Sequence, residues 1–317
     1  METSPDALEK RLSQLKKAVP GRGLARHPSR LRQFSELPPE LQSSIVKSAL
    51  AGEEIEEIIS FPPQIHRGNH YVPKQALLFT PSGVIHLLAS IWPEQEPTIA
   101  YLRVKGLMYV KVTLILLYGF LEIISQGTTS PTRLEVEFNT VAWDLISRPL
   151  RQILEAGKQQ PGEITAEVSL SQRAEWILEK LPLKFFNGAR IYGLLPGEEL
   201  EEMVFQPNVW ERRLVLFRKN IVANTLLMLT SNYMVIIQEE LNVSQGWIIT
   251  YIPRKSIFGI QKLSHIKWEE LIVNLMVAGQ TTTCTIRLTN EIAQDWQKCW
   301  IKHAGQWQDL PILTSQS

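Results

Sequence analysis

Four cationic side chains stand close together in the second part of the chain: Arg212, Arg213, Arg218 and Lys219. Guanidinium and ammonium groups at this density can neutralise phosphate oxygens, and each arginine can donate two parallel hydrogen bonds to them. Glu211 adjoins the group, and surface arginines often form only a solvated rim. The cluster is therefore a candidate ligand-binding site for an anion, with a solvated rim as the alternative.

Two histidines have the spacing of a metal site. His66 and His70 stand four residues apart, which would place both on one side of a helix. Arg67-Gly68-Asn69 between them indicates a turn instead, and neither a cysteine nor a third ligand lies near. We therefore predict no metal site here.

Acidic residues are concentrated in two runs, Glu53 to Glu57 and Glu198 to Glu202. They alternate with Ile55 and Leu200, which is typical of the solvent edges of strands or of helix ends. The motifs of nucleotide hydrolysis, acyl transfer and zinc proteolysis do not occur. The sequence therefore predicts no catalytic residue, no metal and no cofactor, and an enzyme with an unrecognised active site is the alternative.

A repeated octet reveals the organisation of the chain. Gly52-Glu-Glu-Ile-Glu-Glu-Ile-Ile59 returns as Gly197-Glu-Glu-Leu-Glu-Glu-Met-Val204, an offset of 145 positions. Tyr101-Leu-x-x-Lys105 returns as Tyr251-Ile-x-x-Lys255, an offset of 150. Small slips in the offset are what loop insertions between fixed strands produce. The pattern indicates a duplication, which we describe as a first copy (residues 37–157) and a second copy (residues 181–305).

The remaining segments complete the predicted domain plan. Residues 1–35 are expected to form a partly disordered basic arm, residues 158–180 a linker with a connecting helix, and residues 306–317 a tail. Residues 1–33 hold eight Lys or Arg against three acidic residues, a net charge of +5 in a chain whose net charge is +1. We expect this arm to be poorly packed and dispensable for folding, and able to approach anionic surfaces.

Composition favours a folded protein in a reducing compartment. Hydrophobic residues make up 44% of the chain and charged residues 21%, the usual balance for a globular protein. Cys284 and Cys299 are the only cysteines and lack a Cys-x-x-Cys spacing. The longest apolar run, Val112 to Leu121, is too short for a spanning helix. We expect a cytoplasmic protein, with peripheral association at the inner membrane face left open.

Alternating and continuous apolar runs predict a series of short strands. In the first copy we expect a helix from Pro38 or Pro39 to Leu50 and then strands at 76–79, 84–89, 101–104, 110–117, 120–125 and 133–138. In the second copy we expect strands at 220–229, 233–239, 247–252, 257–262, 267–277 and 281–289. Their order without β-α-β alternation predicts antiparallel sheets rolled into a sandwich or open barrel.

Each copy is expected to end in a helix that closes the barrel. The first begins with Asn139 or Thr140 as its N-cap, buries Val141, Leu145, Leu150 and Leu154, and is kinked or divided at Pro149. The second begins near Asn290 and carries Ile292, Ala293, Trp296 and Trp300 at helical spacing. Burial of Ile292 and Trp296 is a direct test of this plan.

The second copy resembles the bacterial pleckstrin-homology-like domain family. The resemblance rests on the hairpin Leu226-Leu-Met-Leu-Thr-Ser-Asn-Tyr-Met-Val-Ile236 and on the strand Tyr251-Ile-Pro-Arg-Lys-Ser-Ile257, followed by a final strand and helix. The first copy keeps the hairpin as Thr80-Pro-Ser-Gly-Val-Ile85, but Arg103 replaces the proline. The resemblance implies a mainly β fold of two antiparallel sandwich or barrel domains, each closed by a C-terminal helix.

The resemblance also implies a binding scaffold without catalytic activity. Members bind proteins, peptides or lipid headgroups, and the fold does not choose among them. Lipid-binding members cluster cations in the loop joining the first strands, where Arg212, Arg213, Arg218 and Lys219 stand here. We expect a partner protein or peptide, with anionic lipid headgroups as the alternative. Nucleic acid is disfavoured because aromatic and cationic residues are not interleaved over a platform; oligomerisation stays open.

Overall fold

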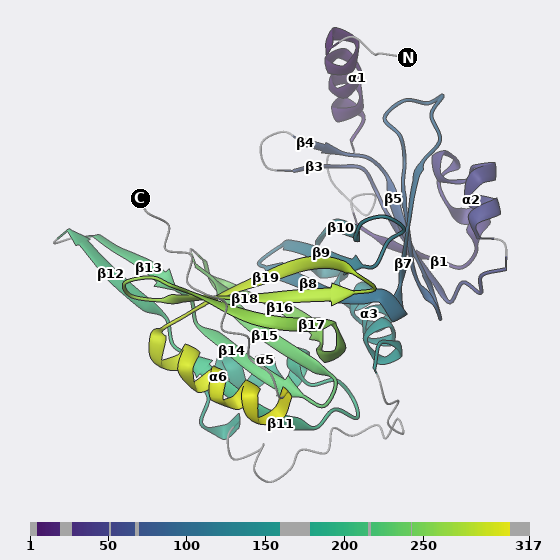
Figure 1. Cartoon of the computed structure of the whole chain (residues 1–317). Coiled ribbons are helices and arrows are strands. Elements are labelled where there is room, and N and C mark those ends of the chain that lie inside the picture. The colour runs from purple at the N-terminus through teal and green to yellow at the C-terminus, as the bar shows by residue number, and fades with distance from the viewer. Residues whose placement is uncertain are drawn as a thin grey trace.

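The protein is described by a computed structural model that covers residues 5–19, 27–50, 52–66, 70–158, 178–214, 217–241 and 243–304. Most of the predicted linker, the tail with Trp307, Arg67 and parts of the basic arm lie outside these residues. The described chain is mainly β, and its paired strands are all antiparallel (Figure 1).

The first half begins with helical segments and continues with strands. Its helices and 3-10 turns are α1 (Pro5–Ala18), η2 (Phe34–Glu36), η3 (Pro39–Leu41), α2 (Ser44–Ala49), η4 (Val104–Gly106), η5 (Thr140–Ala142) and α3 (Trp143–Ala156). Its strands are β1 (Ser29–Leu31), β2 (Glu57–Phe61), β3 (Gln64–His66), β4 (His70–Val72), β5 (Gln75–Thr80), β6 (Gly83–Leu88), β7 (Thr98–Arg103), β8 (Leu107–Ile115), β9 (Tyr118–Ser125) and β10 (Thr132–Asn139).

From β11 onward, the described part of the second half repeats the order of strands that begins with β2 in the first half. Its helical segments are α5 (Leu183–Gly188), η6 (Ala189–Gly193), η7 (Arg254–Ser256) and α6 (Asn290–Ala304). Its strands are β11 (Leu200–Gln206), β12 (Val209–Leu214), β13 (Phe217–Val222), β14 (Thr225–Thr230), β15 (Tyr233–Glu240), β16 (Val243–Pro253), β17 (Ile257–Ser264), β18 (Glu269–Val277) and β19 (Gln280–Leu288).

Strand register repeats between the halves as well. Val84 lies opposite Leu102 across β6 and β7, and Met234 lies opposite Ile252 across β15 and β16. Each residue of the second pair stands 150 positions after its counterpart in the first pair. The strand order β2-β5-β6-β7 corresponds to β11-β14-β15-β16, and β8-β9-β10 corresponds to β17-β18-β19. A two-stranded hairpin is inserted after β2 in the first half, as β3-β4, and after β11 in the second half, as β12-β13. The repeated sequence therefore corresponds to a repeated order and register of strands.

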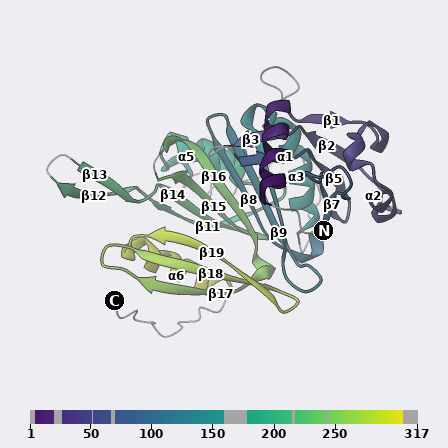
Figure 2. The ribbon, with the colours of Figure 1, turned by 90° about the horizontal axis from the view of Figure 1, so that it is seen from above.

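The two halves are joined by a continuous sheet (Figures 1 and 2). Its order is β10-β9-β8-β16-β15-β14-β11, so β8 of the first half pairs with β16 of the second. We call this pairing the junction. The first half adds a five-stranded sheet, β1-β2-β5-β6-β7, and the second a three-stranded sheet, β17-β18-β19. The expected antiparallel sheets are present, but neither half forms a closed barrel, because β8 takes its neighbour from the other half.

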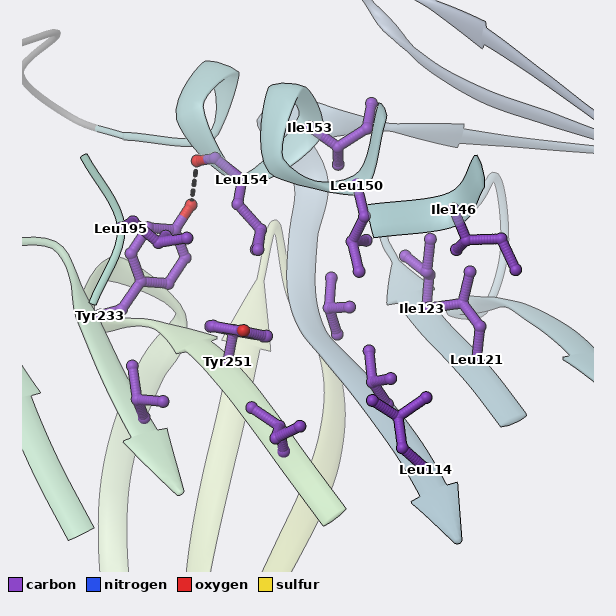
Figure 3. Close-up of a cluster of buried hydrophobic side chains, with 14 of the residues drawn as sticks. Leu114, Leu121, Ile123, Ile146, Leu150, Ile153, Leu154, Leu195, Tyr233 and Tyr251 are labelled. Atoms are coloured by element: carbon purple, nitrogen blue, oxygen red, sulfur yellow. Dashed lines mark hydrogen bonds between the residues drawn. The ribbon is translucent and has the colours of Figure 1, made fainter. Parts of the chain in front are cut away.

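The largest core cluster also crosses from one half to the other (Figure 3). Ile146, Leu150, Ile153 and Leu154 of α3 are buried against β8 and β9 on one side and against second-half residues such as Tyr251 on the other. A second cluster fills the space between the continuous sheet, the three-stranded sheet and α6. The halves are thus packed together through a common interior.

Hydrogen bonds reinforce the contact between the halves. The Tyr233 hydroxyl donates to the Leu154 carbonyl at the end of α3. The Ser256 hydroxyl donates to the Met108 carbonyl (3.1 Å). The Gln280 side chain exchanges two bonds with the Gly127 backbone, at 2.9 and 3.1 Å. These bonds satisfy polar groups that the contact removes from water.

Several local predictions require correction. Val141 is 70% exposed, because Asn139 caps the 3-10 turn η5 and α3 begins only at Trp143. The helix expected up to Leu50 is split into η3 and α2, and the strand expected at 220–229 is split into β13 and β14. The α3 helix runs undivided through Pro149. Trp296 is buried and Ile292 partly buried, as predicted.

The basic arm is only partly separate from the fold. The α1 helix has no buried residue, although the Arg11 side chain donates to the Ile91 carbonyl (2.9 Å). Ser29–Leu31, however, form strand β1 at the edge of the five-stranded sheet, and Arg30 bridges to Glu57 (2.7 Å). The expectation that residues 1–33 are poorly packed is therefore wrong for its last part, because the exposed edge of β2 offers that segment a backbone partner.

Candidate functional site

The four predicted cations all lie on the β12-β13 hairpin. The register places Arg212 opposite Arg218 and Glu211 opposite Lys219. Lys219 is exposed, whereas the side chains of Arg212, Arg213 and Arg218 are outside the described set. The backbone therefore brings the predicted cluster together on a ribbon that projects from the body (Figure 1).

Exposed apolar residues accompany these cations. Trp210 on β12 is 54% exposed, and Ile266, in the turn after β17, is 98% exposed. Lys267 beside it bridges to Glu211 of the hairpin (2.5 Å), which ties the turn to the ribbon. The sequence from Leu214 to Phe217 is entirely apolar and has cations on both sides. This combination of apolar and basic residues suits the boundary between water and lipid headgroups.

The outer face of the three-stranded sheet offers a second candidate surface. Met108 in the first half is fully buried, because the second half covers it. Phe258 stands at the same position, 150 residues later, and is 57% exposed. Gly259 replaces Tyr109 beside it, and a hollow of about 450 Å³ opens between Phe258, Asn274 and Thr283. A surface that is filled in the first half is thus open in the second.

The strand next to this hollow also has an open edge. Among the described residues, β17 pairs only with β18, while its counterpart β8 pairs with both β9 and β16. Unpaired N–H and C=O groups along an edge strand are a template for another strand. Figure 2 shows β17 at one edge of its sheet, with β19 at the other. We call Phe258, the hollow and the β17 edge together the open face.

A longer groove follows α3 between the two halves. It has a volume of about 750 Å³ and is lined by Phe79 and Pro81 of the first half, Trp143 and Arg151 of α3, and Tyr192 of the second half, among others. The Arg151 guanidinium donates to the Ile191 carbonyl (3.1 Å) across one end. Burial, and secondarily the nearby Asp144 carboxylate, raises the pKa of Tyr192. These groups hold the halves together and do not form an acid-base pair.

One group of polar side chains near the contact between the halves is mutually satisfied. The Tyr109 hydroxyl donates to the buried Glu122 carboxylate (2.6 Å), which Arg133 also contacts (2.9 Å). Burial first, and then the hydrogen bond to Glu122, raises the pKa of Tyr109 far above its ordinary value. Burial raises the pKa of the nearby Cys284 thiol to about 11, so it stays protonated and is a poor nucleophile at neutral pH. This cluster therefore has a structural role.

The acidic run of the second half is not a solvent edge throughout. Glu198 is buried and accepts bonds from the Ser231 hydroxyl (3.1 Å) and the Asn232 backbone N–H (2.9 Å). Lys158 lies 3.5 Å from the same carboxylate. The prediction for Glu198 is wrong because the end of α3 covers this hairpin. Glu202 does lie near the surface, where Lys302 and His303 contact its carboxylate.

The two histidines of the first half lie on the other hairpin. His66 is opposite His70 in the β3-β4 register, and the three residues between them are outside the description. Within the described ranges no group of three His, Cys, Asp or Glu is arranged to hold a metal ion. In the same ranges no helix combines the length and apolarity needed to cross a membrane.

Neither a comparison with protein-family models nor a comparison with curated proteins finds a match to this chain. The pleckstrin-homology-like family therefore stays a prediction from the residues quoted above. The sequence motifs do not single out the open face. One signal for it exists: Leu107 to Ile115 is apolar at seven of nine positions, as in strands buried on both faces, whereas Ile257 to Ser264 contains Gln261 and Lys262.

Proposed function

We propose that this chain is a non-catalytic binding module of two pleckstrin-homology-like domains that takes a partner protein at its open face. Two features support the family assignment: four strands followed by three strands and a helix recur in each half, and the quoted hairpin and strand motifs fall on β14-β15 and β16. The edge of β17 would receive an extended segment of the partner by strand addition.

A single observation carries this proposal. The edge of β8 binds another strand, β16, and the side chains beside that edge are buried by the rest of the second half. The equivalent edge and side chains of β17 have no such cover in the described chain. Main-chain bonds along β17 would supply affinity, and the hollow beside Phe258 would select a side chain of the partner.

The test uses extended peptides and a matched pair of proline variants. Successive residues of a strand point their N–H groups to opposite sides, so Gln261→Pro and Lys262→Pro affect opposite edges of β17. One variant removes a donor from the open edge, and the other removes a β17-β18 bond and lowers the thermal midpoint. Peptides are first selected from a random library on the wild-type chain.

Selected peptides should lose at least tenfold in affinity for the proline variant that keeps its thermal midpoint. They should also slow hydrogen exchange at the open-edge amides of β17. Phe258→Ala should weaken them further, because the hollow loses its aromatic wall. Equal binding to the wild-type chain and to the well-folded proline variant would exclude strand addition at β17.

A second function, peripheral membrane association, has its own supporting observation. Trp210 is exposed on the hairpin that carries the four cations, and Ile266 is exposed in the turn that Lys267 ties to this hairpin. Aromatic and aliphatic groups enter the headgroup region while cations contact anionic lipids, and salt weakens the electrostatic part. The hairpin would then act as a membrane contact independent of β17.

Vesicle flotation tests this second function. The double variant Arg212→Glu with Arg213→Glu changes the charge by four units on the hairpin and should abolish flotation with phosphatidylserine vesicles at low salt. The control reverses the same charge elsewhere, at the exposed Lys105 and Lys298. If both double variants lose flotation equally, only net charge matters; if the wild-type chain does not float, protein binding is the sole working function.

A further inference from the structure

The junction defines a specific pairing between one strand type and another. Val112 of β8 lies opposite Ile249 of β16, with Thr113 opposite Ile248 and Lys111 opposite Thr250. When β1 and the inserted hairpins are left out of the count, β8 is the fifth strand of the first half and β16 is the fourth strand of the second half. Both strands of this pairing have a counterpart elsewhere in the same chain.

Those counterparts are edge strands, although β9 and β10 approach β7 and the Ser125 hydroxyl donates to the Arg103 carbonyl at the end of β7 (2.7 Å). The counterpart of β16 is β7, which pairs only with β6 among the described strands; the counterpart of β8 is β17, which pairs only with β18. The backbones of β8 and β17 are also alike, because the pairing register of each strand shifts after its first residue, Leu107 in β8 and Ile257 in β17. One chain therefore displays both halves of a second junction, on different parts of its surface.

We propose that chains associate head to tail, with β7 of one chain pairing with β17 of the next in the register of the junction. This inference rests on the proposed function, because it names the partner of the same open face as a second copy of this chain. Shifting the junction register by 150 positions places Ile99 opposite Lys262, Thr98 opposite Leu263 and Ala100 opposite Gln261.

Two side chains of β7 are less buried than their counterparts at the junction, as this pairing requires. Ile249 and Tyr251 of β16 are buried at the junction, whereas their counterparts Ile99 and Tyr101 are only partly buried. Pairing with a second chain would cover them in the same way. Neither edge carries a charge that would oppose a like charge across this register, because the one charged residue in the three pairs is Lys262.

The second junction would be weaker than the first. Lys262 replaces Val112, and Ser264 replaces Leu114, which lies opposite Trp247 at the junction. Lys262 also keeps an ion pair with Glu269 at 3.3 Å. Less apolar area is therefore buried per pair, and association should be reversible and concentration-dependent. Because the interface is heterologous, it either closes into a ring or continues as a filament.

Opposite charges at a single position provide the test. Ile99→Lys would face Lys262 across the proposed register, and Ile99→Glu would face it with an attractive charge, while both variants lose the same isoleucine contacts. Directly opposed like charges destabilise a strand pair and opposite charges stabilise it. Sedimentation velocity over a concentration series should give an association constant at least threefold lower for Ile99→Lys than for Ile99→Glu.

A covalent measurement covers the case in which the Ile99 variants unfold. Chains carrying Thr98→Cys are mixed with chains carrying Leu263→Cys, in a background in which Cys284 and Cys299 are alanine. Oxidation should link the two chains faster than it links Thr98→Cys chains with chains carrying Ser264→Cys, because only the first pair is in register. Equal rates would overturn the proposed pairing.

Failure of this inference is distinguishable from failure of the proposed function. A wild-type chain that stays monomeric at every concentration, or equal association of Ile99→Lys and Ile99→Glu, would exclude the head-to-tail pairing. Selected peptides could still bind β17 in that case, because neither variant alters that strand. Conversely, loss of self-association in the well-folded β17 proline variant, without loss in the control Lys105→Glu, would support both.

Discussion

The two halves of the chain use an equivalent glutamate in the same place, once near the surface and once in the interior. Glu53 accepts from the Ser82 hydroxyl (2.9 Å) and the Tyr101 hydroxyl (3.1 Å), and so clamps the β5-β6 hairpin. Glu198 clamps the β14-β15 hairpin through Ser231 and Asn232, but it is buried and also meets Lys158.

This difference arises from the contact between the halves and not from the clamp itself. The end of α3 covers the second hairpin, and Lys158 is brought with it into the interior, where it also contacts Glu155 (2.5 Å) and the Pro196 carbonyl. Nothing comparable covers the first hairpin in the described chain. The equivalent glutamates therefore contribute differently to the free energy of unfolding, because only Glu198 is buried by the other half.

Removing the two glutamates should give the largest contrast. Glu198→Ala removes one of the two carboxylates beside the buried Lys158 and leaves the Asn232 N–H without its acceptor, and it should lower the free energy of unfolding by about 3–5 kcal/mol. Glu53→Ala should cost about 1 kcal/mol or less, because water replaces its partners. Urea denaturation of the two variants measures both values, and equal losses would contradict a special role for the contact between the halves.

The next contrast concerns Met108 and Phe258, the equivalent residues on the outer faces of β8 and β17. Met108→Ala removes a fully buried side chain and should cost about 2–5 kcal/mol. Phe258→Ala removes an exposed one and should change the free energy of unfolding by no more than about 0.5 kcal/mol. A large loss for Phe258→Ala in thermal or urea unfolding would mean that the open face is covered in the free chain.

The smallest contrast appears only in acid and involves His86, whose counterpart is the buried Ile236. Burial lowers the pKa of His86 from 6.5 to about 4, and its ring contacts the Gln75 side chain (2.9 Å). The unfolded chain takes up this proton first as the pH falls. Stability is therefore lost from about pH 6.5 downward to about pH 4, by up to about 3 kcal/mol.

His86→Ile imitates the second half and should remove most of this acid-linked loss. The variant also deprives the buried Gln75 of its histidine partner, so its stability at neutral pH is not diagnostic. The slope of unfolding free energy against pH between 6.5 and 4.5 is the quantity to compare. An unchanged slope would show that another group titrates in the first half.

Much of the strand plan could be predicted from the sequence, because period-two alternation and the repeated octet are local signals. The strand expected at 84–89 is β6 at Gly83–Leu88, and that expected at 281–289 is β19 at Gln280–Leu288. The short hairpins β3-β4 and β12-β13 were missed, since each strand has few residues and little alternation. The positions of Arg212 and Arg218 on one hairpin follow from a register that only the three-dimensional structure supplies.

The junction could not be predicted by considering each copy alone. Pairing of β8 with β16 joins residues far apart in sequence, and the apolar character of Met108 or Ile124 fits equally well with an ordinary core position. The burial of Glu198 has the same origin, because its cover comes from Lys158 at the end of the preceding half. Contacts between the copies join residues that are far apart in sequence, and such contacts leave no local sequence pattern from which they could be predicted.

The junction also dictates an order of events during synthesis. When α3 has left the ribosome, the apolar strand β8 has one edge and one face without a neighbour, and it keeps them until β16 and the strands after it are made. At about 5–20 residues per second this interval lasts on the order of ten seconds. The nascent first half is therefore a natural client for chaperones that bind exposed strand edges, and a truncated chain ending near Lys158 should aggregate.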